Sequence, residues 1–182
     1  MTNKNFEEII QIAEGCQASL ENKTITVKGE KGEVKRNLFD PMVSIQIKDN
    51  KIVISTKNLT KRSKKLVNTF KAHIQNMFEG AMRGHTYKLK ICSGHFPMTV
   101  AVKDKKFEIK NFIGEKVPRV INIKEGTTVN IDGSEIVVEG LNKEETSQMA
   151  ASIEQLTRRP GFDKRIFQDG IYMIEKDGKP IK

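Results

Sequence analysis

The sequence contains two groups of basic residues whose side chains are suited to binding anions. Guanidinium and ammonium groups bind phosphate oxygens, and arginine does so through two parallel hydrogen bonds. Both groups therefore predict contact with a polyanion, the alternative for each being a solvated basic face. The first group spans residues 57–71 without an acidic residue and includes Lys61, Arg62, Lys64 and Lys65; the second includes Arg158, Arg159, Lys164 and Arg165.

The composition supports a nucleic acid as the polyanion. The chain has 182 residues, and its 32 Lys and Arg against 23 Asp and Glu give a formal net charge of +9. Such a charge attracts polyanions at long range, and an anionic membrane surface is the second choice. Aromatic residues make up only 6%, and Trp is absent. This scarcity argues against a broad stacking platform for single strands and favours folded RNA recognised by shape and phosphates.

The sequence contains neither a secretion signal pattern at its start nor an apolar run of about 18 residues, the length that a membrane-spanning helix needs. We therefore expect a cytoplasmic protein with no membrane partner. Cys16 and Cys92 lie in separate, strand-like segments. We expect both to be free thiols that behave as small apolar residues.

The segment Cys92-Ser93-Gly94-His95 offers two further kinds of chemistry. Its spacing, with His85 nearby, imitates half of a zinc site, but such a site needs four ligands and the chain has no second Cys pair. Cys92, His95 and an acid are also an enzyme hypothesis, which requires a thiol of low pKa. The acidic pair Glu144-Glu145 begins a predicted helix, where acids stabilise the helix dipole. We predict no catalytic residue, metal, cofactor or small-molecule substrate.

An internal similarity indicates two domains. Positions 25 and 136, which are 111 apart, begin equivalent strands, and the similarity covers two strands and the polar turn between them. A period this long indicates a duplicated domain rather than a stacked repeat. We predict domains at residues 1–82 and 83–182. The corresponding residues are Ile10, Ile12, Gly15, Leu20, Ile25 and Gly29 in the first copy, and Ile121, Ile123, Gly126, Ile131, Ile136 and Gly140 in the second.

Periodicity predicts the same fold class for both halves. Short alternating strands surround polar turns, as in the segments 34–39, 43–47 and 52–54. A stripe including Phe70, Ile74 and Met77 predicts one long helix, and a second helix is expected to begin at Asn142 and end by Pro160-Gly161. The sequence therefore predicts an α+β protein of two tandem domains, each a twisted antiparallel sheet packed against one main helix.

The segment Gly29-Glu30-Lys31-Gly32 imitates the clamp loop of KH domains, which joins two helices. Here it lies between Val27 and Val34 in strand patterns, so we predict a tight hairpin turn.

Three segments resemble the archaeal and eukaryotic branch of the large-subunit ribosomal protein six family. They are the C-terminal signature at residues 148–158 and 163–172, the turn at residues 27–32, and the loop Ser93-Gly94-His95-Phe96-Pro97. Ala13 and Glu30 stand where the family often has proline. The Lys-Gly-Lys-Gly tail of the bacterial form is missing.

The resemblance implies a duplicated α+β structural protein that performs no reaction. Family members bind large-subunit ribosomal RNA chiefly through the second domain and tail, beside the sarcin-ricin loop and near the stalk base, with neighbouring ribosomal proteins as further partners. Carried onto this chain, the implied RNA-binding residues are Ser93, Gly94, His95, Phe96, Arg158, Arg159, Lys164, Arg165, Gln168 and Tyr172. A protein-binding adaptor that uses the sheet of the first domain remains an alternative.

Overall fold

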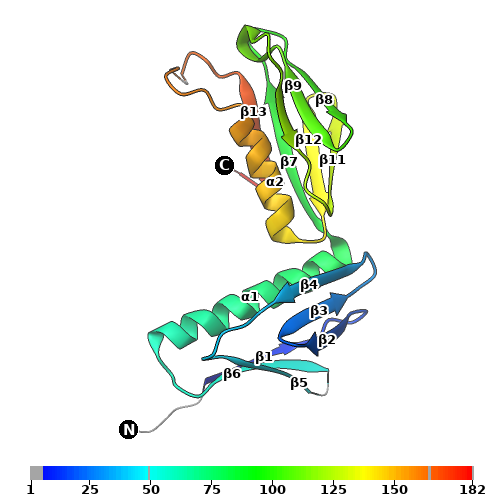
Figure 1. Ribbon diagram of the computed structural model, residues 1–182, viewed down its shortest axis with the longest axis vertical. Helices are drawn as coiled ribbons and strands as arrows, with labels where there is room; N and C mark the ends of the chain where they lie inside the picture. The colour runs from blue at the N-terminus through cyan, green and yellow to red at the C-terminus, as the bar shows by residue number, and fades with distance from the viewer. Residues whose placement is uncertain (1–5, 49, 164, 182) are drawn as a thin grey trace. The chain divides into compact units, whose positions relative to one another are not determined.

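A computed structural model describes residues 6–48, 50–163 and 165–181 (Figure 1). The chain separates into two compact units, one that ends at Gly84 and one that begins at His85. The domain boundary expected after residue 82 lies within the last turn of the first helix, α1 (Lys61–Arg83).

The first unit combines two three-stranded antiparallel sheets with α1. One sheet has the order β1-β6-β5 and the other β2-β3-β4. The sequence predicted the strands and the helix but did not divide the strands between two sheets. The strands are β1 (Phe6–Gln11), β2 (Gln17–Glu21), β3 (Thr24–Lys28), β4 (Glu33–Asn37), β5 (Ser44–Lys48) and β6 (Lys51–Thr56).

The long helix has a defined start and one buried face. The Thr60 hydroxyl accepts a hydrogen bond from the backbone N–H of Ser63, and the Ser63 hydroxyl accepts one from the N–H of Thr60. This capping box satisfies two N–H groups of the first turn and places the helix start at Lys61. The predicted stripe is buried at Phe70, Ile74 and Met77 and packs against strands of both sheets.

The second unit has a larger sheet because the C-terminal segment adds strands to it. A three-stranded sheet has the order β10-β9-β8, and a five-stranded sheet has the order β11-β12-β7-β13-β14. The helix α2 (Lys143–Leu156) packs against the larger sheet over a core that includes Leu89, Ile136 and Ile153 (Figure 1). The strands are β7 (His85–Cys92), β8 (Thr99–Lys103), β9 (Lys106–Lys110), β10 (Arg119–Asn122), β11 (Thr127–Asp132), β12 (Glu135–Gly140), β13 (Gly170–Lys176) and β14 (Lys179–Pro180).

The limits of α2 follow from its caps. As predicted, Asn142 caps the start, because its side-chain oxygen accepts a hydrogen bond from the N–H of Glu144. The helix ends at Leu156, before the predicted stop at Pro160-Gly161. The next residue, Thr157, turns its hydroxyl to the carbonyl of Glu154 and accepts the N–H of Ile171. The residue that follows the helix, Thr157, is thus hydrogen-bonded to β13.

The duplication is confirmed, but the predicted correspondence between the copies is wrong. β6 pairs with β1 and β5 as β12 pairs with β7 and β11, and a helix follows each of these central strands. Two hairpin turns, Asn22-Lys23 and Asp104-Lys105, lie 82 positions apart, and all four of their residues have positive φ. The counterpart of the β2–β3 hairpin is therefore β8–β9. The sequence matched it instead to β11–β12, because short hairpins with polar turns have similar patterns.

The turn at residues 29–32 is the predicted hairpin turn and joins β3 to β4. The N–H of Gly29 donates to the carbonyl of Gly32 at 3.0 Å. A Cβ at Gly29 would lie 2.6 Å from the carbonyl oxygen of Ala81 in α1, so only glycine fits this approach. This arrangement excludes the KH clamp, which joins two helices.

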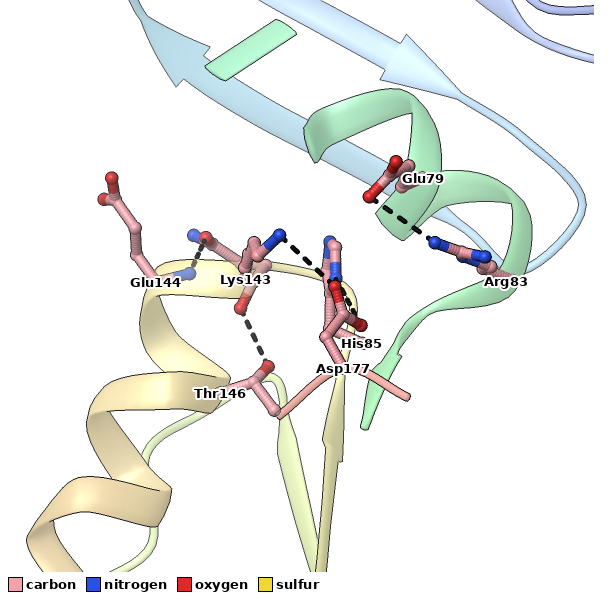
Figure 2. Close-up of polar contacts among 8 residues, drawn as sticks. Glu79, Arg83, His85, Lys143, Glu144, Thr146 and Asp177 are labelled. Carbon is pink, nitrogen blue, oxygen red and sulfur yellow. Dashed lines mark hydrogen bonds and ion pairs between the residues drawn. The ribbon is translucent and has the colours of Figure 1, made fainter. Parts of the chain in front are cut away.

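Contacts among three side chains, those of His85, Lys143 and Asp177, attach the C-terminal hairpin to the rest of the second unit (Figure 2). The ring of His85, which is fully buried, places Nδ1 3.0 Å from Asp177 Oδ2, and Lys143 Nζ lies 3.2 Å from the same oxygen. Burial opposes the ionisation of Asp177, but hydrogen bonds and charge from His85 and Lys143 lower its pKa. These three side chains connect β7, the first turn of α2 and the turn between β13 and β14.

Candidate nucleic-acid interface

The loop at residues 93–97 is fastened to the C-terminal tail by one carboxylate. Asp169 Oδ1 accepts the backbone N–H of Gly94 at 2.6 Å and that of His95 at 2.9 Å, while His95 Nδ1 lies 2.5 Å from Asp169 Oδ2. The side chain of Asp169 is only 4% exposed. The predicted loop and the predicted tail thus form one surface of the second unit.

The charge of Asp169 is stabilised by these contacts. Burial opposes the ionisation of the carboxyl, but hydrogen bonds from the backbone and ring of His95 and from Gly94 outweigh it and lower the pKa of Asp169 to about 2. The carboxylate is therefore ionised at neutral pH, and its acceptor oxygens are used inside the protein.

A row of rings continues this attachment into the tail. The rings of His95 and Phe167 have centroids 5.2 Å apart, and Phe162 meets Phe167 edge to face at 4.9 Å. The guanidinium of Arg159 lies 4.1 Å from the centroid of Phe162. Edge-to-face and cation–π contacts of this kind stabilise a surface loop that has little core of its own.

Arg119, which the sequence analysis did not select, holds the start of the tail. Its guanidinium forms a bidentate pair with Glu115 at 2.6 and 2.7 Å. It also donates to the carbonyls of Leu156 at 2.6 Å and Arg158 at 3.2 Å, at the end of α2. Its sequence position gives no signal for this role, because the carbonyls it binds are remote along the chain.

The structure brings most of the predicted RNA-binding residues together on the loop and the tail. Arg165 differs from the others because its guanidinium pairs with Asp163 at 2.8 Å, although its side chain is 90% exposed. Gln168 donates weakly, at 3.4 Å, to the carbonyl of Arg165. Lys164 lies outside the described residues. The exposed members are Ser93, Gly94, His95, Phe96, Arg158, Arg165, Gln168 and Tyr172, and Arg159 is half-buried.

A cavity of about 100 Å³ opens between the end of α2 and the tail, within this surface. Its walls include both rings of the pair Phe162 and Phe167, together with the side chains of Glu154, Arg158 and Tyr172. This cavity could not be predicted from the sequence, because its walls come from a helix, a loop and a strand that are separate along the chain.

The first unit carries the other basic cluster on the first turn of α1. The side chains of Lys61, Arg62, Lys64 and Lys65 are all exposed, and this turn contains no acidic residue. Lys64 Nζ lies 5.8 Å from the ring centroid of Phe6. Lys71 is directed elsewhere, since it pairs with Glu8 at 2.8 Å. These four residues form a cationic surface on the first unit.

The residues of the rival zinc and enzyme hypotheses have structural contacts. His95 is bonded to Asp169, and His85 is bonded to Asp177 in the interior of the second unit. Cys92, which is half-buried, makes no hydrogen bond to the His95 ring among the described residues. Cys16 is also a free thiol, and burial raises its pKa, with the charge of Glu30 adding to the effect. Within the described part of the chain, no helix is long and apolar enough to cross a bilayer.

Comparison with known proteins gives one consistent family. The family model described as "Ribosomal protein L6" matches residues 12–84 and 96–170, one match in each unit. The "Large ribosomal subunit protein uL6" of Methanosarcina mazei is 42% identical over 173 residues, which cover 95% of this chain and 98% of that protein. The protein of the same description from Methanococcus vannielii is 42% identical over 176 residues, or 97% of each chain.

Proposed function

Because the chain belongs to the ribosomal protein L6 family, we propose that it is a structural constituent of the large ribosomal subunit. In this proposal the second unit binds large-subunit ribosomal RNA near the sarcin-ricin loop and the stalk base, beside neighbouring ribosomal proteins, in cytoplasmic ribosomes. The family and the tandem α+β fold agree with the sequence analysis.

The observation that carries the RNA-binding proposal is the joining of the loop and the tail through Asp169. It joins the loop, which bears the exposed side chains of His95 and Phe96, to the tail, in a protein with a net charge of +9. The side chain of Arg158 is exposed as well. The Arg and Lys side chains of this surface bind phosphates, while His95, Gln168 and Tyr172 contact sugars or base edges. No step of this function requires a catalytic group.

The test is the incorporation of the double variant Arg158→Glu and Arg165→Glu into large subunits. The matched control is Lys124→Glu, which reverses an exposed charge after β10. Tagged proteins are followed by sucrose-gradient sedimentation of cell lysates. The wild type and the control should migrate with large subunits, and the double variant should shift to the free pool with a nearly unchanged melting temperature, because both side chains are exposed.

Normal incorporation of the double variant would refute the tail as the RNA-binding surface. Retention of the double variant through binding to a ribosomal protein alone would instead favour the adaptor hypothesis.

A further inference from the structure

The cavity beside the tail contains polar groups that the protein itself does not use. The Glu154 carboxylate, the Arg158 guanidinium and the Tyr172 hydroxyl line it, and none of these side chains has a hydrogen-bond or ion-pair partner among the described residues. Two other polar side chains of the lining already have partners within the protein. The Thr157 hydroxyl donates to the backbone carbonyl of Glu154 and accepts the N–H of Ile171, and the Asp169 carboxylate accepts the N–H of Gly94 in the loop. At about 100 Å³ the cavity exceeds the about 10–15 Å³ that one ordered water needs.

The walls of the cavity suit a flat ring. Phe162 and Phe167 contribute aromatic surface, and Phe162 and Tyr172 remain 37% and 40% exposed. Because these two exposed side chains belong to the lining, the cavity is open to solvent. Unstacked bases bind by stacking on such rings and by hydrogen bonds along their edges.

Glu154 indicates which kind of base edge fits. Glu154 and Tyr172 both line the cavity. Burial raises the pKa of Tyr172, and negative charge at Cys92, Asp169 and Glu154 raises it further. A carboxylate repels phosphates and accepts hydrogen bonds, so on the proposed RNA-binding surface Glu154 favours a partner with N–H donors. Guanine presents an N–H and an amino group side by side, which match the two oxygens of a carboxylate as an arginine fork does.

We propose that this cavity receives one unstacked guanine of the bound RNA. Glu154 accepts the N–H groups of the base, Tyr172 donates to its carbonyl oxygen, Phe162 stacks on the ring, and Arg158 holds the adjoining phosphate. The inference rests on the proposed RNA-binding function, to which it adds recognition of a single base. It agrees with the scarcity of aromatic residues, because one base requires only one stacking site.

The experiment compares RNA hairpins of one sequence that are fully paired or carry a single bulged G, A, C or U. Dissociation constants for the full chain are measured by fluorescence anisotropy at one salt concentration, with extracted large-subunit RNA as the reference. The G-bulged hairpin should bind about tenfold more tightly than the paired one, and the U-bulged hairpin should gain least. The fluorescence of 2-aminopurine placed next to the bulged G reports whether that guanine leaves the RNA stack.

Two variants separate base recognition from phosphate binding. Glu154→Gln should abolish the preference for G over U and leave the affinity for the paired hairpin unchanged or slightly higher. Glu145→Gln, the same change at an exposed position of α2 outside the cavity, should behave as the wild type. Phe162→Leu should lower the affinity of every bulged hairpin to about that of the paired one, without affecting the paired one.

The possible failures differ between the two proposals. Equal wild-type affinity for paired and bulged hairpins, with normal binding to large-subunit RNA, would overturn the guanine site and leave the proposed function standing. Absence of binding to large-subunit RNA would overturn both. Guanosine monophosphate alone should bind far more weakly than the G-bulged hairpin, and equal affinity would assign the cavity to a free nucleotide instead of RNA.

Discussion

At the scale of single residues, Asp169 determines the form of the proposed interface more than any basic side chain does. The Asp169 carboxylate accepts hydrogen bonds from two backbone N–H groups and contacts the His95 imidazole. It thereby fixes both the path of the loop and the position of the His95 ring. Hydrogen bonds to a charged group contribute on the order of 1.5–3 kcal/mol, more than contacts between neutral groups. The basic residues are consequently displayed on a surface that an acidic residue organises.

Replacement of this carboxylate measures its contribution. Asp169→Asn keeps one acceptor oxygen for the N–H groups of Gly94 and His95 but removes the acceptor that the His95 ring uses, so the free energy of unfolding should fall by about 1–3 kcal/mol. Urea denaturation checks the change, and hydrogen exchange at Gly94 and His95 should accelerate. Asp163→Asn, at an exposed position of the tail, is the control and should have less effect than Asp169→Asn. Unchanged exchange at both amides together with an unchanged free energy of unfolding would show that the charge of Asp169 does not stabilise the loop.

The same carboxylate predicts a pH dependence. Its pKa is about 2 in the folded protein against the ordinary 3.8, so its stabilisation is fully present above pH 3.8 and is lost as the pH falls through about 2. The shift corresponds to about 2 kcal/mol. The difference in unfolding free energy between the wild type and Asp169→Asn should therefore be constant near neutral pH and narrow by about this amount in acid. A difference that stays constant down to pH 2 would contradict the assignment.

That the loop and the tail bind RNA stays a prediction, but the structure shows contacts of these residues that the sequence did not indicate. Gly94 and His95 were expected as RNA contacts, yet their backbone N–H groups serve an acceptor 75 and 74 positions away. Arg165 was expected as a phosphate ligand, and in the structure its exposed guanidinium pairs with Asp163. Contacts that depend on distant partners carry no local signal in a sequence.

At the scale of elements, the sequence predicted the hairpins and helices well. It did not predict which hairpin of the second unit corresponds to a given hairpin of the first. The alternation around Ile25 and the stripe through Ile74 are local patterns, and both gave the right element. The pairing of hairpins between copies depends on which sheet each one joins, and sheet membership is set by contacts remote in sequence. The cavity has the same origin, because α2, the tail loop and β13 meet there only in the fold.

The end of α2 depends on Arg119, and this contact can be tested. Arg119→Lys keeps the charge but loses the bidentate pair with Glu115 and the contacts to two helix-end carbonyls. We expect the free energy of unfolding to fall by about 1–2 kcal/mol and hydrogen exchange to rise at residues 155–159. Lys116→Ala, at a neighbouring exposed position, should change neither quantity. Exchange that rises equally in both variants would remove Arg119 as the cause.

At the scale of the whole molecule, both units bear exposed cations, and the proposal assigns RNA binding only to the second. The cluster at Lys61, Arg62, Lys64 and Lys65 lies at the positive end of the α1 dipole, where cations are unfavourable for the helix itself. Such a cluster is either a further phosphate-binding surface or a solvated face that keeps the protein soluble. The salt dependence of RNA binding separates these alternatives, because each phosphate that is neutralised adds to the slope.

If about six phosphates are neutralised, the affinity of the full chain for large-subunit RNA should fall about a thousandfold between 50 and 200 mM salt. Reversal of Arg158 and Arg165 to Glu should make the slope of log affinity against log salt shallower by roughly two contacts. Replacement of the four α1 cations by Gln should leave that slope unchanged if the second unit alone binds RNA. A shallower slope in the α1 variant would show that the first unit also binds phosphates. A wild-type affinity that hardly changes with salt would contradict RNA binding through phosphate contacts altogether.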